Sequence, residues 1–434
     1  MAVQEVAGLR QEVTELLQDL IRLDTVNPPG NETLAAELLS EYLARNGIQS
    51  GLIARVPDRA NIVARIPGGD GPSLAFLCHT DTVLADPAEW ERDPWSGDLV
   101  DGEIWGRGAL DMKGQVAASA VAFASLRRDG FVPSGDLIFM AVADEEVGDG
   151  YGLRWLAEAH PDAVRCDYAV NEGGGDRLVL GGRPVYLCAT AEKMSAPFVV
   201  RVHGRSGHAS MPGIADNALV KAARYVEALG AYEPPLELVP EARGFLEAVL
   251  DELAPLDEAL DRANELHPML GALVQPLLSF TLAPTMIEAS KKRNVIPAVC
   301  EVTVDCRLLP EQTTADVEPL IRSVLGPGEY ELEWIEAVGG TRSEIQTPLW
   351  DALASFVEEL EPGAALVPNA CPGFTDSHYL RAAFGTVAYG FFPVKAMDAV
   401  EATKLVHSAN ERVPVDDLEA GVQMLRHVAH SLLG

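Results

Sequence analysis

The chain of 434 residues exceeds the size at which a single hydrophobic core stops growing, so we expect two domains. Acidic residues outnumber basic ones by 65 to 33, which gives a formal net charge of −32. A charge of this sign repels phosphate backbones and anionic lipids, and it argues against nucleic acid or a membrane as a partner. No apolar run reaches the roughly 20 residues of a membrane span, and MAVQEVAGLRQEV lacks the features of a signal peptide. We therefore expect a cytoplasmic protein.

The six cysteines are scattered along the chain, and none forms a CxxC pair. Most stand inside apolar, strand-like runs. This pattern predicts small, reduced core residues rather than a disulfide framework or a thiolate metal site.

Helical and strand-like patterns alternate in the first part of the chain. Apolar residues at helical spacing predict a first helix that ends at TVNPPGNE, and a second helix reaches about residue 46. Short apolar runs such as SLAFLCH and DLIFMAVA then alternate with helical stretches such as residues 113–128. This alternation predicts an α/β fold with a mainly parallel sheet flanked by helices.

The pattern changes near residue 190. The runs SAPFVVRVHG and CEVTVDCRLL indicate an antiparallel sheet with helices on one face. We expect an inserted α+β domain over residues 190–311, with an extra helical segment at about residues 234–278. The first domain is then discontinuous and consists of residues 1–189 and 312–434.

Polar residues follow three of the predicted parallel strands, at the end where ligands bind in such sheets. His79 and Asp81 follow SLAFLC, Glu145 and Glu146 follow DLIFMAVA, and Glu172 follows DYAVN. We therefore expect the three strands to converge on one polar site. Asp144 receives no chemical role and is interpreted as structural.

Two further candidates are Asp111 in WGRGALDMKGQ and His407 in LVHSAN. Each candidate alone has an ordinary structural explanation, because Asp111 could cap a helix and His407 could simply end a strand. Their joint placement after apolar runs or glycine turns favours a common site. Two histidines with three carboxylates suit borderline divalent metals such as zinc, and two ions sharing one carboxylate account for all five ligands. One glutamate is then left for proton transfer.

Seven motifs occur in order along nearly the whole chain: HTDTV, GRGALDMKG, DEEVG, NEGGG, SGHASMP, KKRNVIPAVCEVTVDCRLLP and HSANERV. Together they resemble the co-catalytic zinc hydrolases that include aminoacylase, glutamate carboxypeptidase and succinyl-diaminopimelate desuccinylase. The most similar branch is that of carboxypeptidase S and the N-acyl-amino-acid hydrolases. The resemblance implies that the inserted domain is a ferredoxin-like lid through which the family forms homodimers. The extra segment at 234–278 would either build or block that contact.

The resemblance also implies two Zn²⁺ ions per chain, with Mn²⁺ or Co²⁺ as substitutes. Asp111 would bridge the ions and precede a cis peptide bond to Met112. The two ligand sets would be His79, Asp111 and Glu172, and Asp111, Glu146 and His407. Asp81 would orient the His79 ring, and Glu145 would be the general base. Exchange of the roles of Glu145 and Glu146 is the main alternative.

Residues of the inserted domain and the last loop receive substrate roles from the same resemblance. His208 in RSGHASMP would stabilise the oxyanion, often from the partner subunit, unless it is only a turn residue. Asn294 and Arg307 would bind the substrate carboxylate, although Arg307 could instead form a surface ion pair. Gly373 and Thr375 in CPGFTDSHY would contact the same end of the substrate. His378 departs from the family, because many relatives have arginine there.

The expected activity is hydrolysis of the amide bond of an N-acyl amino acid or small dipeptide with a free carboxylate. An aminopeptidase of the same architecture and a catalytically silent ligand-binding protein are the alternatives. The second is disfavoured, because all five candidate ligands and Glu145 are present.

Overall fold

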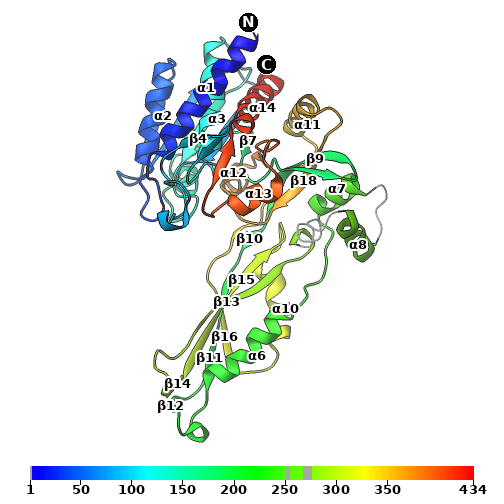
Figure 1. Ribbon diagram of the computed structural model, residues 1–434. Coiled ribbons are helices and arrows are strands. Elements are labelled where there is room, and N and C mark those ends of the chain that lie inside the picture. Colours follow the sequence, from blue (N-terminus) through cyan, green and yellow to red (C-terminus); the bar gives the residue numbers. More distant parts are fainter. Residues whose placement is uncertain (1, 251–254, 267–275) are drawn as a thin grey trace. The chain divides into compact units, whose positions relative to one another are not determined.

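A computed structural model describes residues 2–250, 255–266 and 276–434 (Figure 1). The chain forms two compact units. The first comprises Met1–Thr190, Ser343–Asn369 and Thr375–Gly434, and the second comprises Ala191–Arg342 and Ala370–Phe374. No helix in the described ranges combines the length and apolar character needed to cross a membrane.

The first unit contains a nine-stranded sheet in the order β1-β2-β6-β3-β7-β19-β9-β18, with β8 paired to β9. Its strands are β1 (Ser50–Ala54), β2 (Ala60–Ile66), β3 (Leu74–His79), β6 (Leu137–Val142), β7 (Tyr168–Asn171), β8 (Arg177–Leu180), β9 (Arg183–Glu192), β18 (Ala365–Cys371) and β19 (Val387–Gly390). The central strands β6, β3, β7 and β19 run parallel, while β1, β2 and β9 pair antiparallel toward the edges. The predicted α/β fold with a parallel sheet is confirmed.

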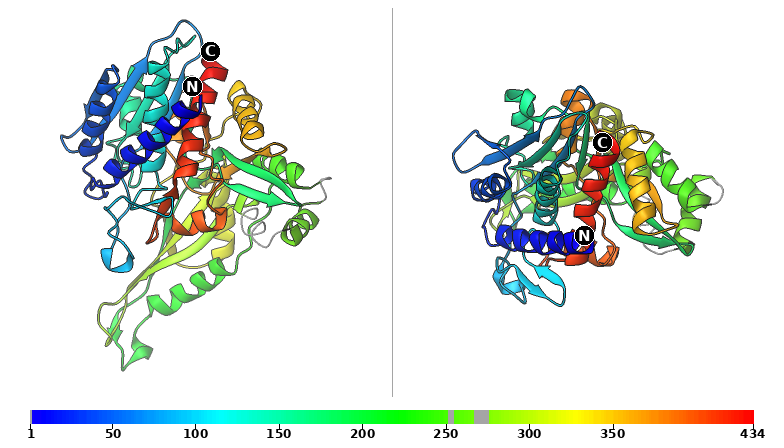
Figure 2. Two further views of the ribbon diagram at one scale, coloured as in Figure 1. Left: turned by 45° about the horizontal axis from the view of Figure 1, so that its top comes forward. Right: turned by 90° about the horizontal axis from the view of Figure 1, so that it is seen from above.

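Helices cover both faces of this sheet, and its central strands are apolar apart from polar residues at their carboxyl ends, such as His79 and Asn171. In β3, Phe76 and Cys78 join the core beneath α1, α3 and α14, whereas Ala75 and Leu77 join the core beneath α4, α5 and α12. Burial on both faces explains the continuous apolar runs in the sequence. Figure 2 shows α1 and α14 side by side on the first face. The helices are α1 (Ala2–Ile21), α2 (Thr33–Arg45), α3 (Lys113–Arg128), α4 (Leu153–Ala159), α5 (Pro161–Val164), α11 (Pro348–Leu360), α12 (Ser377–Phe384), α13 (Ala399–Leu405) and α14 (Val415–Leu433).

A small three-stranded sheet is formed by two strands that follow β3 in the chain and one strand near the end of the chain. It has the order β20-β5-β4, with β4 (Asp98–Val100), β5 (Glu103–Trp105) and β20 (Arg412–Pro414). It therefore pairs the segment before Asp111 with the segment after His407, although these segments are about 300 residues apart in the chain. A 3₁₀ turn, η1 (Pro87–Glu89), precedes it.

The second unit is an antiparallel sheet with α6 (Ala218–Gly230) and α10 (Thr314–Leu325) on one face. The chain order β11-α6-β13-β15-α10-β16 and the spatial order β16-β11-β15-β13 define a ferredoxin-like arrangement. Its main strands are β11 (Phe198–His203), β13 (Thr281–Glu288), β15 (Val299–Leu308) and β16 (Tyr330–Trp334), with the shorter β10 (Met194–Ser195), β12 (Gly207–His208), β14 (Val295–Ile296) and β17 (Val338–Gly339) and the 3₁₀ turn η2 (Pro212–Ile214).

The extra segment predicted at 234–278 forms α7 (Pro240–Val249) and α8 (Leu256–Leu266) where it is described. Residues 251–254 and 267–275 of this segment lie outside the described residues.

The predicted end of the inserted domain at residue 311 is wrong, because residues 312–342 belong to the second unit. The α10 helix buries Val317 and Ile321 in the core of that unit, and β16 pairs with β11. An amphipathic helix and an alternating strand suit either unit equally well by pattern alone.

Candidate metal centre

The carboxyl ends of β3, β6 and β7 deliver polar side chains to one edge of the first unit. His79 is the last residue of β3, Glu145 and Glu146 lie just beyond β6, and Glu172 follows β7. Because these strands are parallel neighbours, their ends meet at the same edge. The expected convergence of three strands is therefore present.

Asp111 lies between the two histidines. Its Oδ1 is 3.1 Å from His79 Nε2, and its Oδ2 is 3.0 Å from His407 Nε2. The bond from Asp111 to Met112 is cis, as the resemblance implies. Burial opposes ionisation of Asp111, but hydrogen bonds from His407 and His79 outweigh it and hold its pKa below the usual value. One carboxylate therefore presents one oxygen to each imidazole.

Glu172 and Glu146 each lie near one of the two histidines that flank Asp111. Glu172 Oε1 is 3.6 Å from His79 Nε2, and Glu146 Oε2 is 3.2 Å from His407 Nε2. Ligand atoms of His79, Asp111 and Glu146 lie within 4.8 Å of one another, as do those of His79, Glu145 and Glu172. Glu146 Oε1 is buried and has no hydrogen-bond partner among the described residues. This set of imidazole and carboxylate donors fits divalent cations.

Without a cation, the acids hold protons on the imidazoles. Hydrogen bonds to Asp111 and Glu146 raise the pKa of His407 to about 10. The pKa of His79 is also raised, because the charge of Glu172 and the hydrogen bond to Asp111 outweigh the effect of burial. A metal ion would compete with these protons, since a ligand histidine must be neutral.

Asp81 holds the backbone of the two glutamates. Its carboxylate accepts hydrogen bonds from the N–H groups of Glu145 and Glu146 at 3.2 and 3.1 Å, and from Asn27 Nδ2 at 2.9 Å. The ring Nδ1 of His79 is 3.1 Å from the Asp81 carbonyl oxygen and 3.4 Å from its Oδ1. The His79 ring is thus oriented through the backbone of Asp81 as well as its side chain.

Glu145 lies on the His79 side of the centre. Burial, followed by the negative charge of Glu172, raises its pKa well above the usual value. The sequence interpretation missed a further acid, Asp376, whose buried Oδ2 has no hydrogen-bond partner in the described part of the chain. The pKa of Asp376 is raised by burial and by the surrounding acids Asp81 and Glu172. Its only signal in the sequence is its place in GFTDSHY.

A second missed residue is Glu411, which is completely buried. Its carboxylate accepts hydrogen bonds from Arg107 Nη1 at 2.6 Å and from three backbone N–H groups, those of Gly108 at 3.0 Å, Leu110 at 2.7 Å and Asp111 at 3.0 Å. Glu411 therefore holds the loop that carries Asp111. Its position in HSANERV, four residues after His407, was the available signal.

In the second unit, His208 and Asn294 lie together and Arg307 lies apart from them. His208 pairs with Val295 in the β12–β14 ladder, and the Ala209 N–H donates to the Asn294 carbonyl at 3.1 Å. Both lie beyond the Val299 end of β15, whereas Arg307 is near its other end. A strand rises about 3.3 Å per residue, so roughly 26 Å of strand separates Val299 from Arg307. Asn294 and Arg307 of one chain therefore do not meet at one small carboxylate.

Arg307 forms an ion pair, as the alternative interpretation of this residue expected. Its Nη2 donates to Asp305 Oδ2 at 3.0 Å, and both side chains are about one-third exposed, at 32% and 36%. Gly373 belongs to the second unit and Thr375 to the first. The Thr375 hydroxyl accepts a hydrogen bond from the Ser377 N–H at 3.3 Å.

Similarity to known proteins extends over nearly the whole chain. Residues 75–431 match the model of peptidase family M20/M25/M40. The chain is 27% identical to an N-fatty-acyl-amino acid synthase/hydrolase of Xenopus tropicalis, over 95% of this chain and 84% of the relative. It is also 27% identical to a succinyl-diaminopimelate desuccinylase of Thioalkalivibrio sulfidiphilus, over 94% of this chain and 96% of the relative. An M20 family metallo-carboxypeptidase from Sulfolobus solfataricus superimposes with a TM-score of 0.74 at 19% identity, over 97% of this chain and 99% of that one.

The fold and the donor set therefore define a metal-dependent hydrolase that acts on amide bonds. More particularly, the chain belongs to peptidase family M20/M25/M40.

Proposed function

We propose that the protein is a dinuclear zinc hydrolase of N-acyl amino acids or small dipeptides with a free carboxylate. The observation that carries this proposal is the position of Asp111, whose two oxygens face His79 at 3.1 Å and His407 at 3.0 Å. Glu172 and Glu146 complete the two ligand sets. Zinc suits these donors best, and Mn²⁺ or Co²⁺ would be accepted by the same atoms.

The chemistry requires a base and an acid beside the scissile bond. Bound divalent cations would lower the pKa of a water molecule and polarise the substrate carbonyl. Glu145 takes the proton from the attacking water and later gives it to the leaving amine. Its raised pKa supports this role, because a carboxyl group that is easily protonated can act in both directions. Asp81 keeps Glu145 in place through the backbone N–H.

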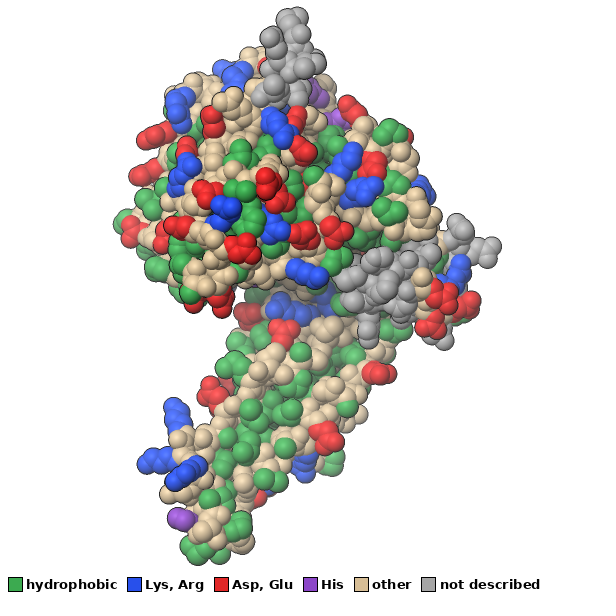
Figure 3. All heavy atoms as spheres, in the orientation of Figure 1, with side chains coloured by type: hydrophobic (Ala, Val, Ile, Leu, Met, Phe, Trp, Pro, Cys, Tyr) green, Lys and Arg blue, Asp and Glu red, His purple; other side chains and the backbone are tan. Residues whose placement is uncertain are grey.

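The substrate class is inferred from the relatives and from local charge. The two relatives act, by name, on an N-fatty-acyl-amino acid and on succinyl-diaminopimelate. Lys291, Lys292 and Arg293 are exposed just before Asn294, in a chain of net charge −32. Figure 3 shows basic side chains gathered near the β12–β14 end of the second unit. Such a local cluster attracts an anionic substrate that the rest of the chain repels.

The test is a screen of N-acyl amino acids, dipeptides and aminoacyl anilides with added zinc, manganese or cobalt. Preference for N-acyl amino acids is expected, whereas hydrolysis of anilides alone would identify an aminopeptidase. Glu145→Ala should abolish turnover and retain about two metal ions, while Glu146→Ala should lose one ion. The reverse result would exchange the roles of Glu145 and Glu146.

We also propose that His208 and Asn294 serve the active site of a partner subunit. The long strand between them and Arg307 supports this arrangement, since one small substrate cannot contact both ends. Glu145→Ala and His208→Ala, each inactive alone, should regain activity when their subunits are mixed. In a mixed dimer the His208→Ala subunit keeps Glu145 and receives His208 from its partner. Failure to complement in verified mixed dimers would contradict action in trans.

A homodimer through the second unit is the corresponding assembly. Exposed apolar side chains on α6 and β13 support it, namely Leu219 (40%), Val220 (67%), Met286 (57%) and Ile287 (50%). Because β13 pairs only with β15 among the described strands, its outer edge can accept another strand. Ile287→Lys should shift the mass measured by light scattering from dimer to monomer. A monomeric wild-type protein would contradict this assembly.

A cytoplasmic location is proposed from the cysteines. All six lie in the described part of the chain, none of them forms a disulfide, and five are buried, which suits a reducing compartment. Fractionation of the source cells would test this location.

A further inference from the structure

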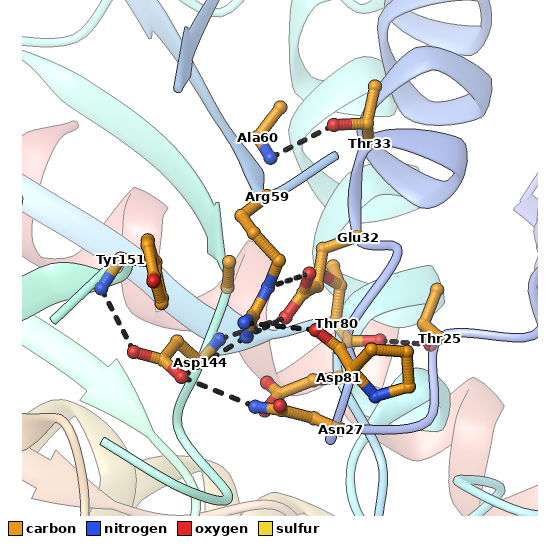
Figure 4. Close-up of polar contacts among 12 residues, drawn as sticks. Thr25, Asn27, Glu32, Thr33, Arg59, Ala60, Thr80, Asp81, Asp144 and Tyr151 are labelled. Atoms are coloured by element: carbon orange, nitrogen blue, oxygen red, sulfur yellow. Dashed lines mark hydrogen bonds and ion pairs between the residues drawn. The ribbon is translucent and has the colours of Figure 1, made fainter. Parts of the chain in front are cut away.

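Glu32, Arg59 and Asp144 form a buried polar network that has no part in the chemistry described above (Figure 4). Arg59 donates from Nε to Glu32 Oε2 at 2.6 Å and from Nη2 to Glu32 Oε1 at 2.7 Å. Arg59 Nη2 also donates to Asp144 Oδ1 at 3.1 Å. The Arg59 side chain is 7% exposed, and those of Glu32 and Asp144 are 0% and 1% exposed. Buried charges are retained where partners surround them, as here.

The network joins three separate segments of the first unit. Glu32 immediately precedes α2, Arg59 immediately precedes β2, and Asp144 follows β6. The planar guanidinium suits this junction, because it donates to two carboxylates in fixed directions. A turn glycine makes room for it: a Cβ on Gly30 would lie 2.3 Å from Arg59 Nε.

Asp144 transmits this anchoring to the active-site turn. Its backbone has φ of 68°, and its N–H donates to Glu32 Oε1 at 3.3 Å. Its carboxylate accepts a hydrogen bond from the Tyr151 N–H at 2.9 Å. The residue directly before Glu145 is thus held through both its backbone and its side chain.

Asn27 forms a second connection to the same turn. Its Nδ2 donates to Asp144 Oδ1 at 3.3 Å and to Asp81 Oδ2 at 2.9 Å. Asp81 in turn accepts hydrogen bonds from the backbone N–H groups of Glu145 and Glu146. The network is therefore connected to the two glutamates in two ways. Asp144 is bonded directly to Glu145, and Asn27 links Asp144 to Asp81, which holds the N–H groups of both glutamates.

We propose that Glu32, Arg59 and Asp144 are positioning residues that fix the orientation of Glu145 and Glu146 at the metal centre. This inference rests on the proposed function, because it assigns those glutamates to metal binding and proton transfer. If the network only stabilised the fold, its mutation would lower the melting temperature and leave the geometry of the metal centre unchanged. Small displacements of catalytic groups are costly, so the two cases differ in kcat.

The main test compares Arg59→Lys with Arg177→Lys. Lysine keeps the charge but cannot reproduce the two-pronged contact. Arg177 forms a more exposed pair of the same two-pronged geometry with Glu361, at 2.7 and 2.6 Å, in the same unit and is the control. Each variant is loaded with Co²⁺, and its visible absorption spectrum, kcat, KM and melting temperature are measured. The substrate is the N-acyl amino acid hydrolysed fastest in the screen.

For Arg59→Lys we expect an altered cobalt spectrum and a kcat at least about tenfold lower, with KM within about twofold of the wild type. Arg177→Lys should keep the wild-type spectrum and kcat. A wild-type spectrum and kcat in folded Arg59→Lys would overturn the proposal. If Arg59→Lys does not fold, Asp144→Asn provides the same test, since it keeps the side-chain size and removes the charge facing Arg59.

The cobalt spectrum also separates this proposal from the proposed function. If the wild type hydrolyses no N-acyl amino acid but Arg59→Lys or Asp144→Asn alters the spectrum, the substrate class is wrong and the positioning role stands. If the wild type hydrolyses such substrates and both variants keep its spectrum and kcat, the positioning role alone is wrong.

Discussion

The carboxylate of Glu411 accepts a hydrogen bond from the backbone N–H of Asp111 at 3.0 Å. The same oxygen accepts from Leu110, and the other oxygen accepts from Gly108 and Arg107. A fully buried side chain near His407 therefore fixes the backbone of the residue between the two histidines.

Glu411→Gln should destabilise the fold by about 3–5 kcal/mol, because an amide presents N–H groups to donors and leaves Arg107 uncompensated. Urea unfolding measures this loss, and the affinity for metal should fall with it. Glu103→Gln is the control, because the Glu103–Arg412 contact of 3.0 Å lies in the adjacent small sheet with a half-buried glutamate. Its expected cost is below about 1 kcal/mol. Equal effects of the two substitutions would contradict the special role of Glu411.

Removal of single ligands should separate the two metal positions. His79→Ala and His407→Ala should each retain about one ion per chain, whereas Asp111→Ala should retain less than one, because both positions use its carboxylate. Mass spectrometric metal analysis after dialysis gives the stoichiometry. His160→Ala serves as the control and should retain about two ions, because the His160 ring makes an edge-to-face contact with Trp155, with ring centroids 5.0 Å apart. An Asp111→Ala protein with a full complement of metal would rule out the bridge.

Gly390→Ala should disturb Glu172 through the backbone. A Cβ at this position would lie 1.9 Å from the Glu172 carbonyl oxygen, so β19 or the loop after β7 has to move. We expect a loss of stability of about 1–3 kcal/mol and weaker metal binding. Gly51→Ala in β1 is the control, because its nearest neighbour atom would be 3.9 Å away. Unchanged calorimetric affinity for zinc in Gly390→Ala would contradict the expectation.

His378 should make stability depend on pH. Burial and the nearby charge of Arg381 lower the pKa of His378 to about 4, whereas an unfolded histidine titrates near 6.5. The unfolded state therefore binds more protons between these values, and the stabilisation present above about pH 6.5 is lost as the pH falls toward 4. His378→Gln should reduce this decline by about 1–2 kcal/mol. Parallel stability curves for the variant and the wild type from pH 4 to 7 would show that His378 does not contribute.

The sequence was most informative where periodicity and chemistry coincided. The apolar runs ending in His79, Glu145 and Glu172 predicted parallel strands converging on one edge, and this arrangement is present in the structure. Asp111 and His407 were candidates because each follows an apolar run or a glycine turn, although neither follows a strand of the large sheet in the structure. Their assignment to the two ligand sets came from the resemblance.

Some residues act through contacts with segments that are far away in the chain, and the sequence pattern could not predict their roles. Glu411 contacts a loop about 300 residues away in the chain, and Arg59 joins Glu32 to Asp144 across separate elements. Asp144 was interpreted only as structural, since its partners are invisible in a linear sequence. The separation of Asn294 from Arg307 likewise follows from the direction of β15, which no local motif reveals.

The crowding of acids around His79 links folding to the supply of ions. Burial and neighbouring negative charge raise the pKa of Glu145, Glu146 and Glu172, so their ionised forms oppose the native state, and bound cations would relieve this cost. A ligand that binds only the folded chain adds about 1.4 kcal/mol of stability for each tenfold rise in its free concentration above the dissociation constant. Trace-metal availability during synthesis and storage should therefore change how long the protein survives heat and proteases, even when no substrate is present.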